Sequence, residues 1–199
     1  GTASGVFYSE YIEGSSNNKY LEIFNGTGSS IDLANYTVLH FNNGSATPTY
    51  TLALSGTLAN NDVYVIENQS EALGVAADLS TSSSVMTFNG DDAIALSNTS
   101  THAYCDIIGR IGEDPGTAWT NGSLATVNQT LVRKSSVSGG VTTNPDSGFP
   151  TLGTEWDMYA VDTVSDLGSP TLGGAGEPPM APSTPIADPA PPSQSAPLP

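Results

Sequence analysis

Carboxylates placed on turns are the residues of this chain with the clearest chemical potential. Asp91 and Asp92 follow an Asn-Gly pair, and Glu113 and Asp114 precede a Pro-Gly pair. Ca²⁺ takes about six to eight oxygen ligands, and carboxylates on turns supply them. We therefore interpret Asp91, Asp92, Glu113 and Asp114 as candidate calcium ligands. The alternative is turn capping, in which the same oxygens accept hydrogen bonds from backbone N–H groups, since no EF-hand or repeat spacing unites them.

Catalytic patterns are absent from the sequence. The chain has two histidines, His40 and His102, one cysteine, Cys105, and no Gly-X-Ser-X-Gly or His-Glu-X-X-His motif. His40 lies in an alternating run typical of a strand, so we interpret it as a structural residue. Cys105 also lies in a β-rich run, where a free cysteine behaves as a small buried hydrophobic residue. The sequence therefore predicts a protein that is not an enzyme.

The charge balance limits the partners of the chain. Its 199 residues include 20 Asp and Glu but 4 Lys and Arg, which gives a formal net charge of −16. Such a field repels phosphate backbones, so we expect no direct contact with nucleic acid. No apolar run has the length of a membrane span. The chain begins at Gly1 without a charged leader, and we expect a secreted, extracellular protein whose targeting segment has been removed.

Asn-X-Ser/Thr acceptor sites occur about twice as often as composition predicts, which favours a glycosylated extracellular surface. The alternative is coincidence in a protein that never meets the glycosylating enzyme. The seven candidate sites are Asn25, Asn35, Asn43, Asn68, Asn98, Asn121 and Asn128.

Short apolar runs separated by Gly and Asn turns predict an all-β fold. Val6–Glu13 and Lys19–Asn25 are rich in β-branched and aromatic residues, which favour strands. Several more such runs are typical of a sandwich or a barrel. They are Tyr36–Phe41, 49–54, 62–67, 85–88, 93–96, 104–111 and 130–133. Residues 70–79 are the only segment predicted to form a helix, and it would be short because it contains Gly74.

Alternation along these strands predicts which side chains are buried. The core candidates are Phe7, Tyr11, Leu21, Ile23, Val38, Val65, Ile94, Ile107 and Leu131. Trp119 and Trp156 are expected to close the open end of the sandwich. The same alternation places Glu10, Glu13 and Glu22 on the solvent face, or beside Lys19.

Several motifs of the chain resemble the lamin tail domain family, especially its secreted bacterial branch. They are Ser9-Glu-Tyr-Ile-Glu-Gly-Ser-Ser-Asn-Asn-Lys19, Glu22-Ile-Phe-Asn25, Val63–Glu67, 86–96, 106–112, 114–119, 130–134 and 155–157. The resemblance covers roughly residues 6–168. It implies an immunoglobulin-like β-sandwich with no chemistry of its own, of the kind found beside extracellular nucleases and phosphatases. We therefore assign residues 1–170 to one lamin-tail-like sandwich.

Residues 171–199 form a separate, proline-rich tail, here called the arm. The stretch 173–199 holds nine prolines and no basic residue. Such a segment cannot close a hydrophobic core and favours polyproline II, which at about 3.1 Å per residue reaches roughly 80 Å. We expect its prolines to contact a second copy of the chain, the candidates being Pro178, Pro179, Pro182, Pro185, Pro189, Pro191 and Pro192.

Three functions remain open at this point. The first is a structural module that assembles head to tail into glycosylated fibres, with the arm docked on aromatic side chains of the next copy. The candidates for that contact are Tyr8, Tyr20, Phe24, Tyr50, Tyr64 and Tyr159. The second is an accessory domain of a secreted nuclease or phosphatase. The third is a calcium-dependent adhesion module, calcium being the one cofactor that the sequence suggests.

Overall fold

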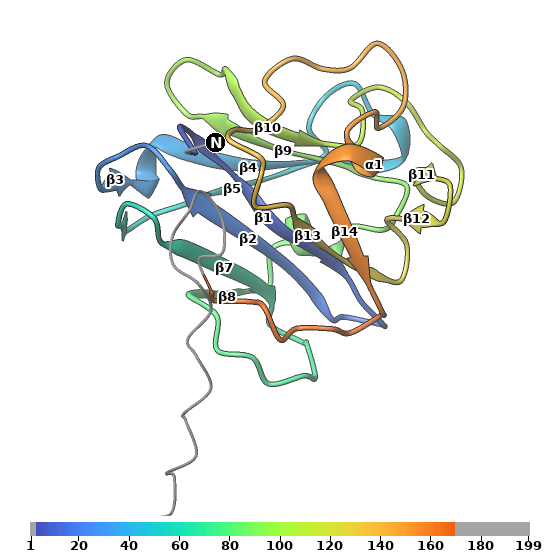
Figure 1. The fold of residues 1–199 in the computed structure, drawn as a ribbon, viewed down its shortest axis with the longest axis horizontal. Helices are drawn as coiled ribbons and strands as arrows, with labels where there is room; N and C mark the ends of the chain where they lie inside the picture. The colour runs from blue at the N-terminus through green and yellow to red at the C-terminus, as the bar shows by residue number, and fades with distance from the viewer. Residues whose placement is uncertain (1–2, 170–199) are drawn as a thin grey trace, which may run out of the picture.

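The computed structural model describes residues 3–169 of the chain. These residues form two packed β-sheets with long connecting loops (Figure 1). The predicted immunoglobulin-like β-sandwich is confirmed. The arm, with all seven prolines predicted to mediate assembly, lies outside the described residues.

The larger sheet has six strands in the order β14-β13-β1-β2-β7-β8. Its neighbouring strands are antiparallel except for β7 and β8, which run parallel. The central position of β1 places the N-terminal strand beside β13, which comes more than 100 residues later in the sequence. The bounds are β1 Val6–Glu13, β2 Lys19–Asn25, β7 Val63–Asn68, β8 Leu79–Thr81, β13 Gln129–Arg133 and β14 Trp156–Tyr159.

The smaller sheet has four antiparallel strands in the order β10-β9-β4-β5. Two short antiparallel pairs, β3 with β6 and β11 with β12, lie outside the two main sheets. The bounds are β3 Ile31–Asp32, β4 Tyr36–Phe41, β5 Tyr50–Ala53, β6 Thr57–Leu58, β9 Ala93–Asn98, β10 Tyr104–Ile108, β11 Thr120–Asn121 and β12 Leu124–Ala125. Helical turns are few: η1 Leu33–Asn35, η2 Asn42–Gly44, η3 Ser84–Thr87 and α1 Leu152–Glu155. Over residues 3–169, no helix is long and apolar enough to cross a membrane.

The main core lies between the two sheets, and all nine predicted core residues are buried. Trp119 and Trp156 are buried in the same core, as predicted. Three of the nine lie elsewhere, however. Phe7 and Val65 belong to apolar clusters on the outer face of the six-stranded sheet, and Ile107 to one on the outer face of the four-stranded sheet. Loops therefore cover large parts of both outer faces.

A β-bulge in β1 changes the alternation on which the sequence analysis depends. The register of β1 against β2 shifts between Tyr8 and Glu10. The extra residue lets both Tyr8 and Tyr11 enter the central core. The same shift leaves Glu10 and Ile12 on the outer face of the six-stranded sheet, where Ile12 joins the cluster with Tyr20 and Val65.

Two predicted elements are wrong. Residues 85–87 lie in the 3₁₀ helix η3 and Phe88 follows it, so 85–88 do not form a strand; Ser83 accepts the N–H of Val85 as the cap of η3. Residues 70–79 form a loop and the start of β8 instead of a helix. The Glu71 carboxylate there accepts the N–H groups of Leu73 and Gly74, and Gly74 has φ of +71°, which ends helical geometry.

Candidate functional site

The outer face of the four-stranded sheet contains an open groove. One row across this face consists of Thr51, Leu39, Ala95 and Ile107, one from each strand. Val141 packs over the Ile107 end of the row. The Thr51 end stays uncovered and forms a hollow of about 350 Å³, lined by Thr37, Leu39, Pro48, Thr51, Ser97, Thr99, His102 and Tyr104.

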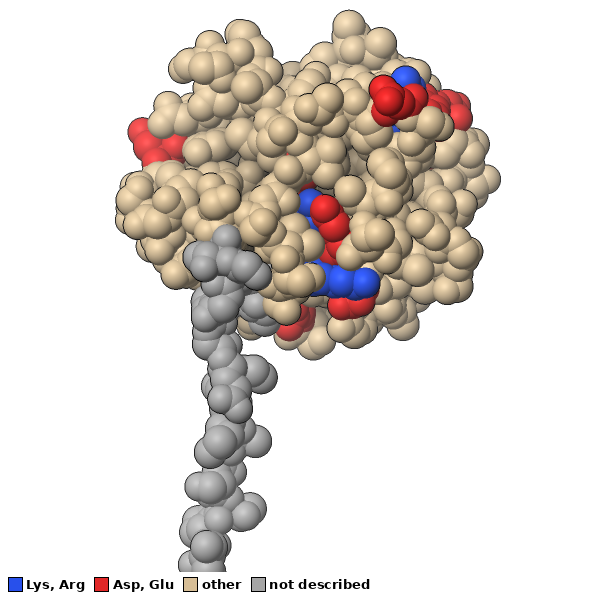
Figure 2. All heavy atoms as spheres, turned by 45° about the horizontal axis from the view of Figure 1, so that its top comes forward, with Lys and Arg blue, Asp and Glu red and all other residues tan. Residues whose placement is uncertain are grey.

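The open groove is lined by uncharged side chains. Hydroxyl groups, such as those of Thr37 and Thr99 at 3.1 Å from each other, alternate with the rings of Pro48 and Tyr104. Such a lining can bind an extended ligand through ring contacts and hydroxyl hydrogen bonds. Figure 2 shows that uncharged residues also dominate the visible face of the molecule. The Lys and Arg atoms on this face lie beside Asp and Glu atoms.

The aromatic residues predicted to receive the arm do not form one surface. Tyr8, Tyr20 and Phe24 are fully buried, so their part of the prediction is wrong. The β1 bulge and the loops over the outer sheet face account for this burial, because they turn expected surface positions into core. Tyr50 and Tyr159 are exposed, on different sheets. Tyr104, which lines the open groove, was missed because its strand was considered for Cys105 and for the core candidate Ile107, and not for a surface contact.

Asp92 is a capping residue in the structure. Its carboxylate lies 2.8 Å from Nε2 of His40 and accepts the backbone N–H groups of Asn43 and Asn89 at 2.9 and 2.7 Å. Burial opposes ionisation of this carboxyl, but the hydrogen bonds outweigh it and hold its pKa below the ordinary value. Nδ1 of His40 contacts the carbonyl of Ser84 at 3.3 Å. Both residues are thus engaged in holding the β4–β9 end of the sheet together.

The other three candidate calcium ligands lie in separate surroundings. Asp114 accepts the N–H of Gly116 at 2.8 Å, which is a turn-capping bond, and Glu113 accepts the N–H of Gly148 at 3.1 Å. Burial raises the pKa of Asp91, one of whose oxygens has no partner. In the part of the chain that the structure describes, no three His, Cys, Asp or Glu side chains are gathered for a metal. The four carboxylates are therefore not brought together as a ligand set.

The acceptor asparagines fall into three groups. Asn35, Asn43, Asn121 and Asn128 are exposed, and Asn98 is half-buried. Asn25 and Asn68 are buried, and their amide nitrogens donate inside the fold, to the carbonyls of Ser29 and Met86 among others. A glycan replaces one amide hydrogen and needs space, so the prediction is wrong for Asn25 and Asn68 in the folded protein.

The prediction that the strand glutamates are solvated is also wrong. Glu10 and Glu22 are each 1% exposed, and Glu13 is buried in an ion pair with Lys19, the partner that the sequence suggested. The residues that cover Glu10 and Glu22 come from 160–168, more than 130 positions later. Val164 and Leu167 were the available signal, since two apolar residues after the last strand indicate a segment that packs back onto the sheet.

Comparison with known sequences tests the family to which this chain belongs. The family model of the lamin tail domain matches residues 1–112, which is shorter than the range 6–168 over which the motifs resemble that family. A search of curated proteins finds no match. The matched part contains β1, β2, β4, β5, β7, β9 and β10, and thus strands of both sheets. The chain belongs to the lamin tail domain family.

Proposed function

We propose that this chain is a non-catalytic, extracellular structural module that assembles with copies of itself. In this proposal the arm of one copy binds the open groove of the next. Such a contact joins two different surfaces, and it generates a filament when its rotation does not close a ring. The observation that carries the proposal is the uncharged, half-apolar groove on a protein with a net charge of −16.

Electrostatics favours the groove as the contact surface. Two copies with the same strong negative charge repel each other, most strongly where carboxylates would face carboxylates. The arm contains Glu177 and Asp188 without a compensating Lys or Arg. The lining of the groove contains no carboxylate, so the arm can enter it without a facing like charge.

The shape of polyproline II also suits this site. The conformation is already extended, so binding costs less conformational entropy than the ordering of a Gly/Ser linker, and its carbonyls stay available as acceptors. The hydroxyl of Thr51 is a donor of the matching type, and Tyr104 offers a ring face. Rings against an aromatic side chain and carbonyls against hydroxyls are the contacts that proline-rich segments use.

The chemistry of the described residues supports a non-catalytic role. His40 is fully engaged with Asp92 and Ser84, so it is not free to activate a nucleophile. Burial, followed by the nearby Asp106, raises the pKa of Cys105, which disfavours the reactive thiolate. An extracellular location with glycans at exposed acceptor sites is part of the same proposal.

Deletion of residues 173–199 tests the assembly. The full chain should sediment as oligomers or form fibres in electron micrographs, and the truncated chain should stay folded and monomeric. Leu39→Glu places a charge in the open groove and should also abolish assembly, whereas Val161→Glu, an exposed position on the other sheet's side, is the matched control. If the truncated protein assembles as well as the full chain, the arm is a linker and the accessory-domain function takes the place of this one.

A further inference from the structure

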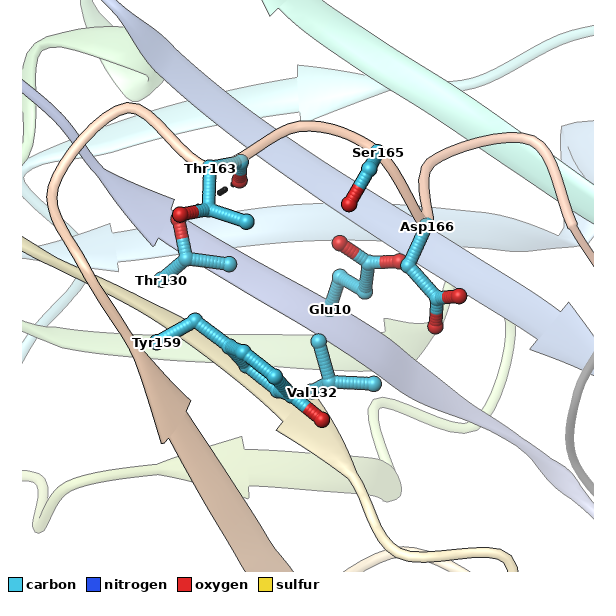
Figure 3. A pocket seen from close by; sticks show the side chains of 7 residues that line it. All are labelled: Glu10, Thr130, Val132, Tyr159, Thr163, Ser165 and Asp166. Atoms are coloured by element: carbon cyan, nitrogen blue, oxygen red, sulfur yellow. Dashed lines mark hydrogen bonds between the residues drawn. The ribbon is translucent and has the colours of Figure 1, made fainter.

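Residues 160–168, here called the strap, cross the outer face of the six-stranded sheet (Figure 3). Val164 and Leu167 pack against the apolar cluster of Ile12, Tyr20 and Val65. The strap lies beyond the residues that match the family, so it adds a cover to that sheet face.

Polar contacts hold both ends of the strap. At its beginning the Asp162 carboxylate accepts the N–H of Ser15 at 2.9 Å. At its end the N–H of Gly168 donates to Oε2 of Glu22 at 2.7 Å, while the hydroxyl of Ser9 donates to Oε1 at 2.6 Å. Glu22 is therefore a satisfied buried carboxylate, with one partner on the strap and one on β1.

A cavity of about 90 Å³ lies between the strap and the sheet. A water molecule needs about 10–15 Å³ of such volume, so the cavity has room for an ion and several waters. Most of its walls carry oxygen atoms, and none is basic: the lining residues are Glu10, Thr130, Val132, Tyr159, Thr163, Ser165 and Asp166. The Thr130 hydroxyl donates to the Thr163 carbonyl at 2.7 Å and fixes one side of the cavity.

Glu10 is the unexplained group in this cavity. It is 1% exposed, and neither of its carboxylate oxygens has a hydrogen-bond partner. Its side chain rises from β1 toward Ser165 and Asp166 on the strap (Figure 3). Burial, followed by the charges of Glu22 and Asp166, raises its pKa to about 9. Without a ligand, Glu10 would thus hold a proton at neutral pH.

Protonation of Glu10 removes one of the two costs of burying this carboxylate. It removes the charge, but the O–H donor and the carbonyl acceptor still lack partners in the protein. A hydrated cation in the cavity removes both costs, because it attracts the carboxylate and its water molecules supply hydrogen bonds. It also offsets the repulsion among Glu10, Glu22 and Asp166.

We propose that the cavity under the strap binds one Ca²⁺, with the carboxylates of Glu10 and Asp166 as its charged ligands. The side chains that line the site offer only oxygen ligands, whereas Zn²⁺ prefers nitrogen and sulfur ligands. The lining therefore disfavours Zn²⁺. Ca²⁺ accepts irregular sets of about six to eight oxygens that include hydroxyls and water, whereas Mg²⁺ requires near-octahedral geometry. Since no three acidic side chains are already gathered within residues 3–169, the hydroxyl of Ser165 and water complete the set.

The ion would clamp the strap onto the sheet. Glu10 belongs to β1, in the part that matches the family, and Asp166 to the strap, in the part that does not. The bound ion would therefore join the two parts of the chain. This inference goes beyond the proposed assembly, and the two sites share no lining residue.

Calorimetric titration of the chelator-treated full chain with Ca²⁺ is the direct test. We expect one Ca²⁺ site per chain, and the binding heat should disappear when chelator is present in excess. The other titratable groups that face Glu10 are Glu22, Asp166 and Tyr159. Tb³⁺ should bind in place of Ca²⁺ and emit on excitation of Tyr159, which lines the cavity, and excess Ca²⁺ should quench this emission by displacing the Tb³⁺.

Three variants separate this cavity from other acidic sites. Glu10→Gln keeps the shape of the side chain and should fold, but should lose at least about tenfold in Ca²⁺ affinity, and Asp166→Asn should do the same. Asp91→Asn, in the turn first considered for calcium, is the control and should bind as the wild type does. The proposal is overturned if millimolar Ca²⁺ gives no heat and no rise in melting temperature, or if Glu10→Gln binds unchanged.

Discussion

The guanidinium of Arg133 and the carboxylate of Asp106 join the two sheets across the interior, with Nη1 and Oδ2 at 2.8 Å. Arg133 ends β13 of the six-stranded sheet, and Asp106 lies in β10 of the four-stranded sheet. Both side chains are fully buried. The guanidinium also lies 4.6 Å from the ring centroid of Trp156 and donates to Glu155 at 2.6 Å. The charge pair is thus part of the core of the sandwich.

Arg133→Met should destabilise the protein by about 3–5 kcal/mol, because it leaves the buried carboxylate of Asp106 without its cation. Urea denaturation at neutral pH measures the loss. The double variant Arg133→Met, Asp106→Asn removes both charges and should be more stable than the sum of the two single losses predicts. Strictly additive losses would show that the two side chains do not act as a pair.

The buried carboxyl of Glu10 should make stability depend on pH. Its pKa is raised from 4.5 to about 9 in the folded chain. The folded state therefore binds this proton more tightly than the unfolded state does. Its contribution is complete below pH 4.5 and is lost as pH rises toward 9, at up to about 1.4 kcal/mol per pH unit.

Denaturation of the wild type and of Glu10→Gln in chelator, at pH 5 and pH 8, measures this dependence. The glutamine has no proton to lose, so its advantage over the wild type should grow with pH. Saturating Ca²⁺ should reduce the growth, since the ion stabilises the ionised form of Glu10. Parallel stability profiles for the two proteins would contradict the burial of Glu10.

Local patterns predicted the frame of this fold well. The bounds of β1, β2 and β4 agree with the runs read from the sequence, because β-branched and aromatic residues between turn residues specify strands locally. The alternation along these strands predicted the burial of the nine core candidates, although Phe7, Val65 and Ile107 lie in the outer clusters. The bulge at Ser9 has no such local signature, because it is defined by the pairing of β1 with β2. The sequence therefore does not show that the bulge places Glu10 on the outer face of the sheet.

The candidate sites depend on contacts that sequence spacing does not show. The open groove takes residues from the four strands of the smaller sheet and from the loops beside them, and no motif unites them. Glu10 meets the strap across more than 150 positions. Arg133 was part of a recognised family motif, but its partner Asp106 lies in the other sheet. In each case tertiary packing decides the role of the residue.

Glycans, where the native protein carries them, should be confined to the four exposed asparagines and the half-buried Asn98. Asn35, Asn43, Asn121 and Asn128 present their side chains to solvent. Asn25 donates to three carbonyls, those of Ser29, Leu58 and Ala59, and accepts from Thr27, so a sugar there would break the turn after β2.

Peptide mapping by mass spectrometry of material from the native host tests this distribution. We expect added mass on peptides with the four exposed residues and bare peptides at Asn25 and Asn68.

As a structural control, Asn25→Gln should lower the unfolding free energy by about 1–3 kcal/mol, because the longer side chain cannot keep all of the hydrogen bonds of Asn25 and leaves buried carbonyls without donors. Asn35→Gln, at an exposed position, should change stability by less than about 0.5 kcal/mol. A glycan found on Asn25 would mean that this turn opens in the native protein, against the packing described above.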